Sequence, residues 1–167
     1  MSAEISHIIS QEVIKMWKKF KPYVISVAIA LAVGGLSALL TKGSMDIYTT
    51  LNQPALSPPS WVFPVVWTIL FTLMGISAAR VYLKNRTNNG LIVYGIQLVV
   101  NLLWSIIFFN LRAFLFSFIW LLLLWILIII MIMEFAKTDK LAAYLQVPYL
   151  LWVTFAGYLN YMIYILN

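Results

Sequence analysis

The sequence predicts an all-α membrane protein, a bundle of five transmembrane helices. Of the 167 residues, 63% are hydrophobic and only 10% are charged. Soluble domains average about 45–50% apolar and about 25% charged residues, so a globular cytosolic protein is excluded. One spanning helix needs about 20 apolar residues, and the apolar content suffices for five. The apolar run 121–133 does not alternate as barrel strands do.

Residues 1–21 are predicted to form a basic amphipathic leader ahead of a membrane domain at 22–167. In the leader, apolar residues recur every three or four positions, with lysines largely between them. The apolar set is Ile5, Ile8, Ile9, Val13, Met16, Trp17 and Phe20, and the basic set is Lys15, Lys18, Lys19 and Lys21. This pattern is typical of a helix lying on an anionic membrane surface, and a solvated basic leader is the alternative.

The membrane domain contains five apolar segments that are each long enough to cross a bilayer. They are expected at about 22–40, 61–83, 91–110, 113–135 and 141–166. The connection 41–60 is the one long loop. Leu111 and Arg112 alone join spans three and four, so these helices are expected to be antiparallel neighbours.

The distribution of lysine and arginine predicts the orientation. The leader and the connections after spans two and four carry nine of these residues, whereas the opposite side carries Lys42 and Arg112. The excess places the N-terminus in the cytoplasm, and the long loop and the C-terminus outside, for a multi-pass protein of the cell membrane. The net charge of +6 is then a topology signal and predicts no nucleic-acid partner.

Several chemistries are excluded by composition. The chain has no cysteine and a single histidine, His7, so no metal site and no Ser/His dyad are expected. No charged residue lies at the centre of a span, which argues against ion-coupled transport.

Uncharged polar residues form a stripe in span three. Gln97, Asn101 and Ser105 are spaced by four and share one helix face. An amide in lipid without partners costs a few kcal/mol, so the stripe must face the bundle. Two interpretations stay open, a hydrogen-bond ladder between helices and the polar wall of a ligand cavity.

Three tryptophans lie about two turns inside their spans, where interfacial anchoring explains them poorly: Trp67, Trp104 and Trp152. In span five, Trp152, Ala156 and Asn160 repeat at four and continue the wall. Aromatic faces with a few amides favour a flat, largely apolar ligand.

Small residues also repeat at four in the first two spans. They are Ala30, Gly34 and Ala38, followed by Gly75 and Ala79. Such stripes permit close helix approach, either inside the bundle or in a homodimer.

Four segments resemble the TspO/MBR family of tryptophan-rich sensory proteins, translocator proteins and peripheral-type benzodiazepine receptors, in a bacterial-type form. They are YTTLNQPALSPPS at 48–60, WVFPVVWTILFTLMGISAAR at 61–80, YGIQLVVNLLWSIIFF at 94–109 and VPYLLWVTFAGYLNY at 147–161. The resemblance implies a five-helix bundle, often dimeric, with a pocket under the first loop for porphyrins, such as protoporphyrin IX and haem, and for isoquinoline-type drugs. Carried over residue by residue, the implied pocket consists of Tyr48, Pro58, Trp67, Phe71, Asn101, Trp104, Phe108, Trp152 and Ala156.

Two departures from the family pattern bear on activity. Some bacterial members are proposed to degrade porphyrin in light through paired tryptophans, and only Trp152 of the pair is present here because Ile47 replaces the other. A catalytic residue is therefore not expected, unless Trp152 is photochemically active. No basic residue follows Tyr161, so the sterol motif of animal members is absent and sterol binding is not expected.

The expected function is that of a membrane receptor or carrier for tetrapyrroles, acting in their homeostasis or in stress signalling. The porphyrin or haem would be a ligand, with no cofactor required. The alternatives are a light-dependent porphyrin-degrading enzyme and a structural protein that only contacts membrane partners.

Overall fold

The computed structural model describes residues 2–44 and 47–167, and all regular secondary structure in them is helical. The side chains at 2–6, 8–10, 13, 47 and 49 lie outside the described part, among them that of Ile47. The elements are α1 (Ser2–Thr41), α2 (Ile47–Thr50), α3 (Val62–Lys84), α4 (Asn89–Ser105), the π-helical turn η1 (Ile106–Asn110), α5 (Phe114–Ala136), α6 (Lys140–Tyr144) and α7 (Val147–Leu166).

Within the described residues, five helical segments are long and apolar enough to cross a membrane, which confirms the predicted fold class. They are Ile14–Thr41, Val62–Lys84, Asn89–Asn110, Phe114–Ala136 and Lys140–Leu166. The fifth is interrupted, because α6 ends at Tyr144 and α7 begins at Val147, with Pro148 in its first turn. Proline is tolerated there because the first helical amides have no intrahelical acceptor.

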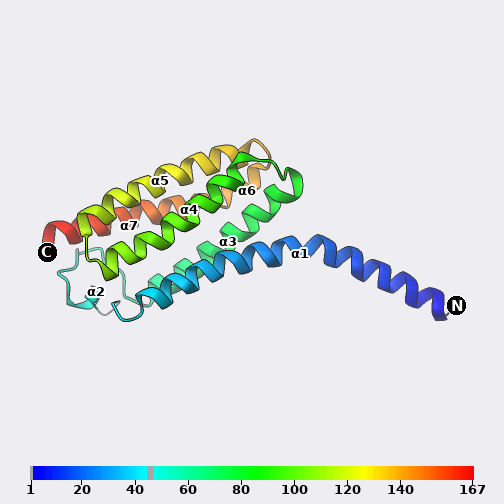
Figure 1. Cartoon of the computed structure of the whole chain (residues 1–167), viewed down its shortest axis with the longest axis horizontal. Coiled ribbons are helices and arrows are strands. Elements are labelled where there is room, and N and C mark those ends of the chain that lie inside the picture. Colours follow the sequence, from blue (N-terminus) through cyan, green and yellow to red (C-terminus); the bar gives the residue numbers. More distant parts are fainter. Residues whose placement is uncertain (1, 45–46) are drawn as a thin grey trace.

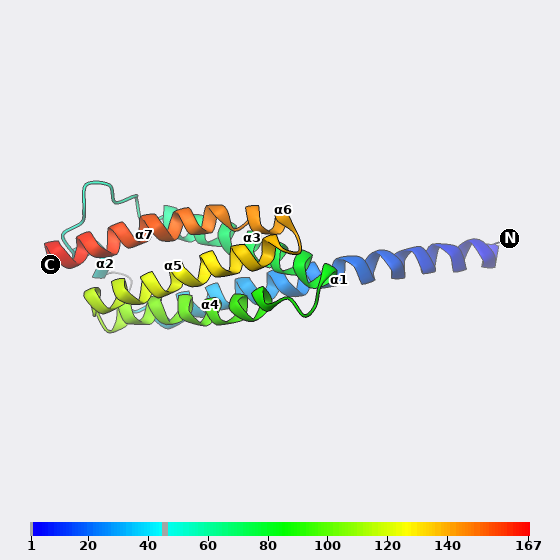
Figure 2. The same ribbon diagram turned by 90° about the horizontal axis from the view of Figure 1, so that it is seen from above.

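The leader and the first span form one continuous helix. Pro22 lies inside α1, and no boundary separates the leader from the span. The N-terminal part of α1 projects beyond the bundle, with Trp17 and Phe20 exposed (Figures 1 and 2). Its location on a membrane surface stays a prediction.

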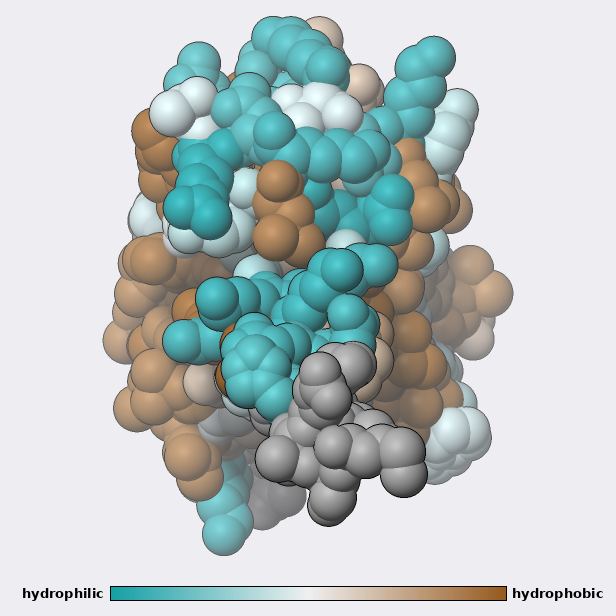
Figure 3. Space-filling view, turned by 90° about the vertical axis from the view of Figure 1, so that its right-hand side faces the viewer, coloured by the Kyte–Doolittle hydropathy of each residue, from teal (hydrophilic) through white to brown (hydrophobic). Residues whose placement is uncertain are grey.

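The long helices run side by side in an elongated bundle (Figures 1 and 2). Helix α1 packs against α3 and α4, and α5 packs against both α4 and α7. The C-terminus and the segment containing α2 lie at one end, which we call the loop end; α6 and the projecting N-terminus lie at the other, which we call the basic end (Figure 1). Viewed onto the basic end, polar residues cover this end and apolar residues cover the flanks (Figure 3), as expected for a bundle whose sides face lipid.

Helices α1 and α3 approach closely at Gly75. A Cβ atom placed on Gly75 would lie 2.5 Å from the Cα atom of Val27, so no larger residue fits without moving the backbone. Ala30 and Ala79 are buried as well. These small residues therefore serve packing inside the bundle.

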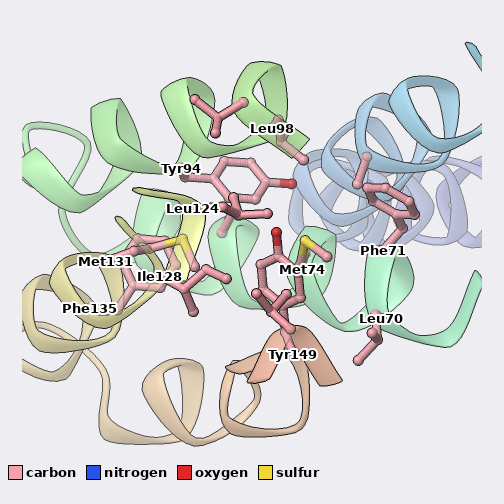
Figure 4. Close-up of a cluster of buried hydrophobic side chains, with 14 of the residues drawn as sticks. Leu70, Phe71, Met74, Tyr94, Leu98, Leu124, Ile128, Met131, Phe135 and Tyr149 are labelled. Carbon is pink, nitrogen blue, oxygen red and sulfur yellow. The ribbon is translucent and has the colours of Figure 1, made fainter. Parts of the chain in front are cut away.

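The core lies between α3, α4, α5 and α7, near the middle of the bundle. Figure 4 shows Met74 and Tyr149 beside one another, with Leu124, Ile128 and Met131 nearby. All five side chains are at most 1% exposed. This packing fixes the relative positions of the helices that carry the polar stripe and the tryptophans.

Candidate ligand cavity

A cavity of about 490 Å³ lies in the half of the bundle nearer the loop end. Its walls come from α1, α3, α4, η1 and α7, and Tyr48 of α2 and Ser60 add to them. The lining residues are Leu31, Gly34, Gly35, Ser37, Ala38, Thr41, Tyr48, Ser60, Phe63, Pro64, Trp67, Thr68, Phe71, Asn101, Trp104, Ser105, Phe108, Phe109, Ala156, Leu159, Asn160 and Ile163. All of these described residues are uncharged.

Two aromatic pairs, on different helices, line the cavity. On α3, the rings of Trp67 and Phe71 have centroids 5.6 Å apart. Trp104 of α4 stacks on Phe108 of η1, with ring centroids 5.5 Å apart and an interplanar angle of 29°. Pairs at these distances hold one another in place, so the walls are largely pre-formed.

The polar stripe of α4 contains both features that the sequence left open, a hydrogen-bond ladder between helices and a polar cavity wall. Gln97 and Asn101 bond to Tyr149 of α7, with distances of 2.8 Å to its hydroxyl, and this is the ladder between helices. Asn101 and Ser105 also line the cavity. The stripe is therefore a ladder near the middle of the bundle and a cavity wall closer to the loop end.

Asn160 ties the wall to α5. Its Oδ1 atom accepts hydrogen bonds from Trp104 Nε1 at 3.2 Å and from Ser117 Oγ at 3.0 Å. Its Nδ2 atom donates to the carbonyl oxygen of Phe114 at 2.8 Å. The indole of Trp104 is thereby fixed in orientation.

Seven of the nine residues predicted for the pocket line the cavity: Tyr48, Trp67, Phe71, Asn101, Trp104, Phe108 and Ala156. Pro58 is half-buried in the loop, where the neighbouring Ser57 Oγ accepts a hydrogen bond from the Tyr48 hydroxyl at 3.3 Å. Trp152 is not among the lining residues. Its ring packs against Phe63 at 5.9 Å, and its buried Nε1 atom has no hydrogen-bond partner within the described residues.

Sequence reasoning missed the contribution of α1 and that of Phe109 in η1. Gly34, Ala38 and Thr41 line the cavity from α1 at spacings of four and three, a signal that small-residue packing also produces. Leu159 and Ile163 extend the face of Ala156 and Asn160 on α7. The helical repeat could have identified these two residues.

Comparisons with known proteins agree with this architecture. Residues 26–166 match the model of the TspO/MBR family. The chain is 42% identical to the tryptophan-rich protein TspO of Chlorobaculum tepidum over 157 residues, which cover 91% of this chain and 99% of that protein. It is 38% identical to the protein CrtK of Rhodobacter capsulatus, over 89% of this chain and 92% of that protein. It is 31% identical to the translocator protein of Bos taurus, over 84% of this chain and 88% of that protein. This chain, a multi-pass membrane protein with five candidate spans, therefore belongs to the TspO/MBR family.

Proposed function

We propose that the protein is a membrane receptor or carrier that binds planar tetrapyrroles, such as protoporphyrin IX or haem, in the cavity between α1, α3, α4 and α7. Isoquinoline-type compounds would occupy the same space. The role would lie in tetrapyrrole homeostasis or stress signalling, and the tetrapyrrole would be a ligand. By the positive-inside rule, the basic end would face the cytoplasm and the loop end the outside of the cell membrane.

The observation that carries this proposal is the chemistry of the cavity walls. Trp67, Phe71, Trp104 and Phe108 present aromatic surface from two sides, and the polar groups between them are uncharged. The volume of about 490 Å³ falls in the range of roughly 300–1,000 Å³ that is usual for small-molecule sites. A flat, conjugated, mostly apolar body suits such walls.

The absence of charge among the described lining residues also predicts the pose. Carboxylates on the ligand would keep their hydration if they stayed at the loop end, near Tyr48 and Ser60, while the apolar body entered the bundle. The edge of the ligand without carboxylates would then lie closest to Asn101.

Titration of the detergent-purified protein with protoporphyrin IX, followed by tryptophan fluorescence quenching, tests the proposal. We expect saturable binding with a micromolar dissociation constant, about −8 kcal/mol. Trp104→Leu should weaken binding about tenfold, because it removes one aromatic wall and an anchored indole.

The matched control is Trp125→Leu. Trp125 also donates its Nε1 hydrogen, to Thr154 Oγ1 at 2.9 Å, but it does not line the cavity. Binding should be unchanged in this variant. Quenching that does not saturate, or that is equal in all three proteins, would mean that porphyrin merely partitions into the micelle.

A further inference from the structure

A directed chain of hydrogen bonds leads from the cavity wall into the core. Asn101 Nδ2 donates to the Tyr149 hydroxyl at 2.8 Å, and this hydroxyl donates to Gln97 Oε1 at 2.8 Å. Gln97 Nε2 in turn lies 3.8 Å from the sulfur of Met74 and donates to it. Figure 4 shows the hydroxyl of Tyr149 beside the Met74 side chain. Asn101 is 3% exposed, and the other three residues are at most 1% exposed.

The sulfur at the inner end sets the direction of this chain. A thioether sulfur only accepts hydrogen bonds, so the amide nitrogen of Gln97 faces Met74 and the amide oxygen faces Tyr149. The Tyr149 hydroxyl has one hydrogen, which it gives to Gln97, and it must therefore accept from Asn101. One hydrogen of Asn101 Nδ2 is thereby engaged in the core, and this bond fixes the orientation of the amide, whose Oδ1 atom is left for the cavity that Asn101 lines.

The neighbouring donors of the wall are engaged as well. Trp104 gives its N–H to Asn160, and the Nδ2 atom of Asn160 donates to the Phe114 carbonyl. One helical turn from Asn101, the hydroxyl of Ser105 has no hydrogen-bond partner within the described residues, and Ser105 lines the cavity. The inner wall thus offers the cavity the amide oxygen of Asn101 as an acceptor beside the Ser105 hydroxyl, whereas the single indole hydrogen of Trp104 is already used within the protein.

We infer that, among tetrapyrroles, the cavity prefers those that present a hydrogen-bond donor to Asn101, and that Met74, Gln97 and Tyr149 impose this preference as positioning residues. The donor would be a hydroxyl or an amide or lactam N–H on the carboxylate-free edge that enters deepest; protoporphyrin IX carries only vinyl and methyl groups there and would bind without this contact. The inference rests on the proposed function, since it takes a tetrapyrrole in the cavity as the ligand. It adds a chemical preference that aromatic walls alone do not set.

Two matched probes test this preference, haematoporphyrin dimethyl ester and its di-O-methyl ether. Both carry their esters on one edge, and on the opposite edge the hydroxyl hydrogens of the first are replaced by methyl groups in the second. We expect the alcohol to bind the unchanged protein about fivefold more tightly than the ether, the factor given by one net hydrogen bond of ordinary strength.

The Gln97→Met variant shows whether the affinity difference comes from the directed chain of hydrogen bonds or only from the different sizes of the two probes. Without the Gln97 oxygen, the Tyr149 hydroxyl is free to donate its hydrogen to Asn101 Oδ1 once the Asn101 amide turns over by 180°, and the amide nitrogen of Asn101 then faces the cavity. Alcohol and ether oxygens both accept, so the affinity ratio of the two probes should fall to about one while both still bind. Tyr149→Phe should have the same effect, and it serves if Gln97→Met does not fold.

The control is Gln146→Met, the same substitution at a fully buried glutamine between α6 and α7 whose amide has no hydrogen-bond partner within the described residues. It should keep the fivefold ratio. Equal affinities of the two probes for the unchanged protein, or a ratio that survives in Gln97→Met and Tyr149→Phe, would overturn the inference and leave the proposed function standing. If neither probe binds saturably, the inference and the proposed function are both overturned.

Discussion

Replacing Asp139 with alanine is expected to lower the free energy of unfolding by about 3 kcal/mol, since a buried charge partner and a helix cap are lost together. The Asp139 side chain is 3% exposed, and its Oδ2 atom lies 2.9 Å from Arg80 Nη2 and 3.0 Å from Lys84 Nζ. Its Oδ1 atom accepts from the amides of Leu141 and Ala142 at the start of α6. One carboxylate thus joins α3 to α6 at the basic end.

The pH dependence has a defined sign. Burial by itself raises the pKa of Asp139, but the hydrogen bonds from Lys84 and the Ala142 amide and the charges of Arg80 and Lys84 outweigh it, so the pKa lies below its ordinary value. The stabilisation is therefore complete above pH about 4, and it is lost as the pH falls through the lowered pKa of the folded state. Asp139→Ala should lack this acid-induced loss.

Reversible unfolding in mixed micelles, followed by circular dichroism, measures both effects. Glu12→Ala is the control, because Glu12 and Lys15 form an exposed ion pair whose side chains are 65% and 81% exposed. Exposed pairs contribute about 0–1 kcal/mol. Equal stability of Asp139→Ala and Glu12→Ala would contradict the proposed role of Asp139.

Gly75→Ala is expected to destabilise the bundle by about 3 kcal/mol, at the upper end of the range for overpacking. The added Cβ would lie 2.5 Å from Val27 Cα and 2.8 Å from Val27 N. Backbone atoms cannot turn aside as a side chain can, so α1 and α3 must separate. Because both helices also line the cavity, protoporphyrin IX affinity should fall in the same variant.

Gly95→Ala provides the matched control for this prediction. A Cβ on Gly95 would meet no atom within 4 Å, so only the higher helix propensity of alanine, up to about 1 kcal/mol, should act. Its stability should be equal to or greater than that of the unchanged protein. If Gly75→Ala unfolds at the same denaturant concentration as Gly95→Ala, α1 and α3 are not in the close contact described.

The five spans could be predicted because each is a long apolar run bounded by polar residues. The interruption between α6 and α7 could not, although Pro148 offered a signal, since proline also occurs inside spanning helices. Pro22 shows this ambiguity directly, because it lies inside the continuous helix α1.

Within the cavity, Asn101 and Trp104 could be predicted. Both lie deep inside one span, where an amide must avoid lipid and a tryptophan is too far from the interface to act as an anchor. Trp152 was placed with Ala156 by the same repeat. In the structure its ring packs against Phe63 and Phe155 instead. Helical spacing gives the side of α7 on which a residue lies, but the direction of a long side chain depends on the neighbours that it meets.

The central claim is that the space between α1, α3, α4 and α7 is the ligand site, and filling that space tests it most directly. Ala156 lines the cavity and is buried, whereas Ala32 on α1 is exposed and does not line it. Protoporphyrin IX binding should be lost in Ala156→Trp and unchanged in Ala32→Trp, with both proteins folded by circular dichroism. Binding of unchanged affinity to folded Ala156→Trp would place the ligand elsewhere and contradict the claim.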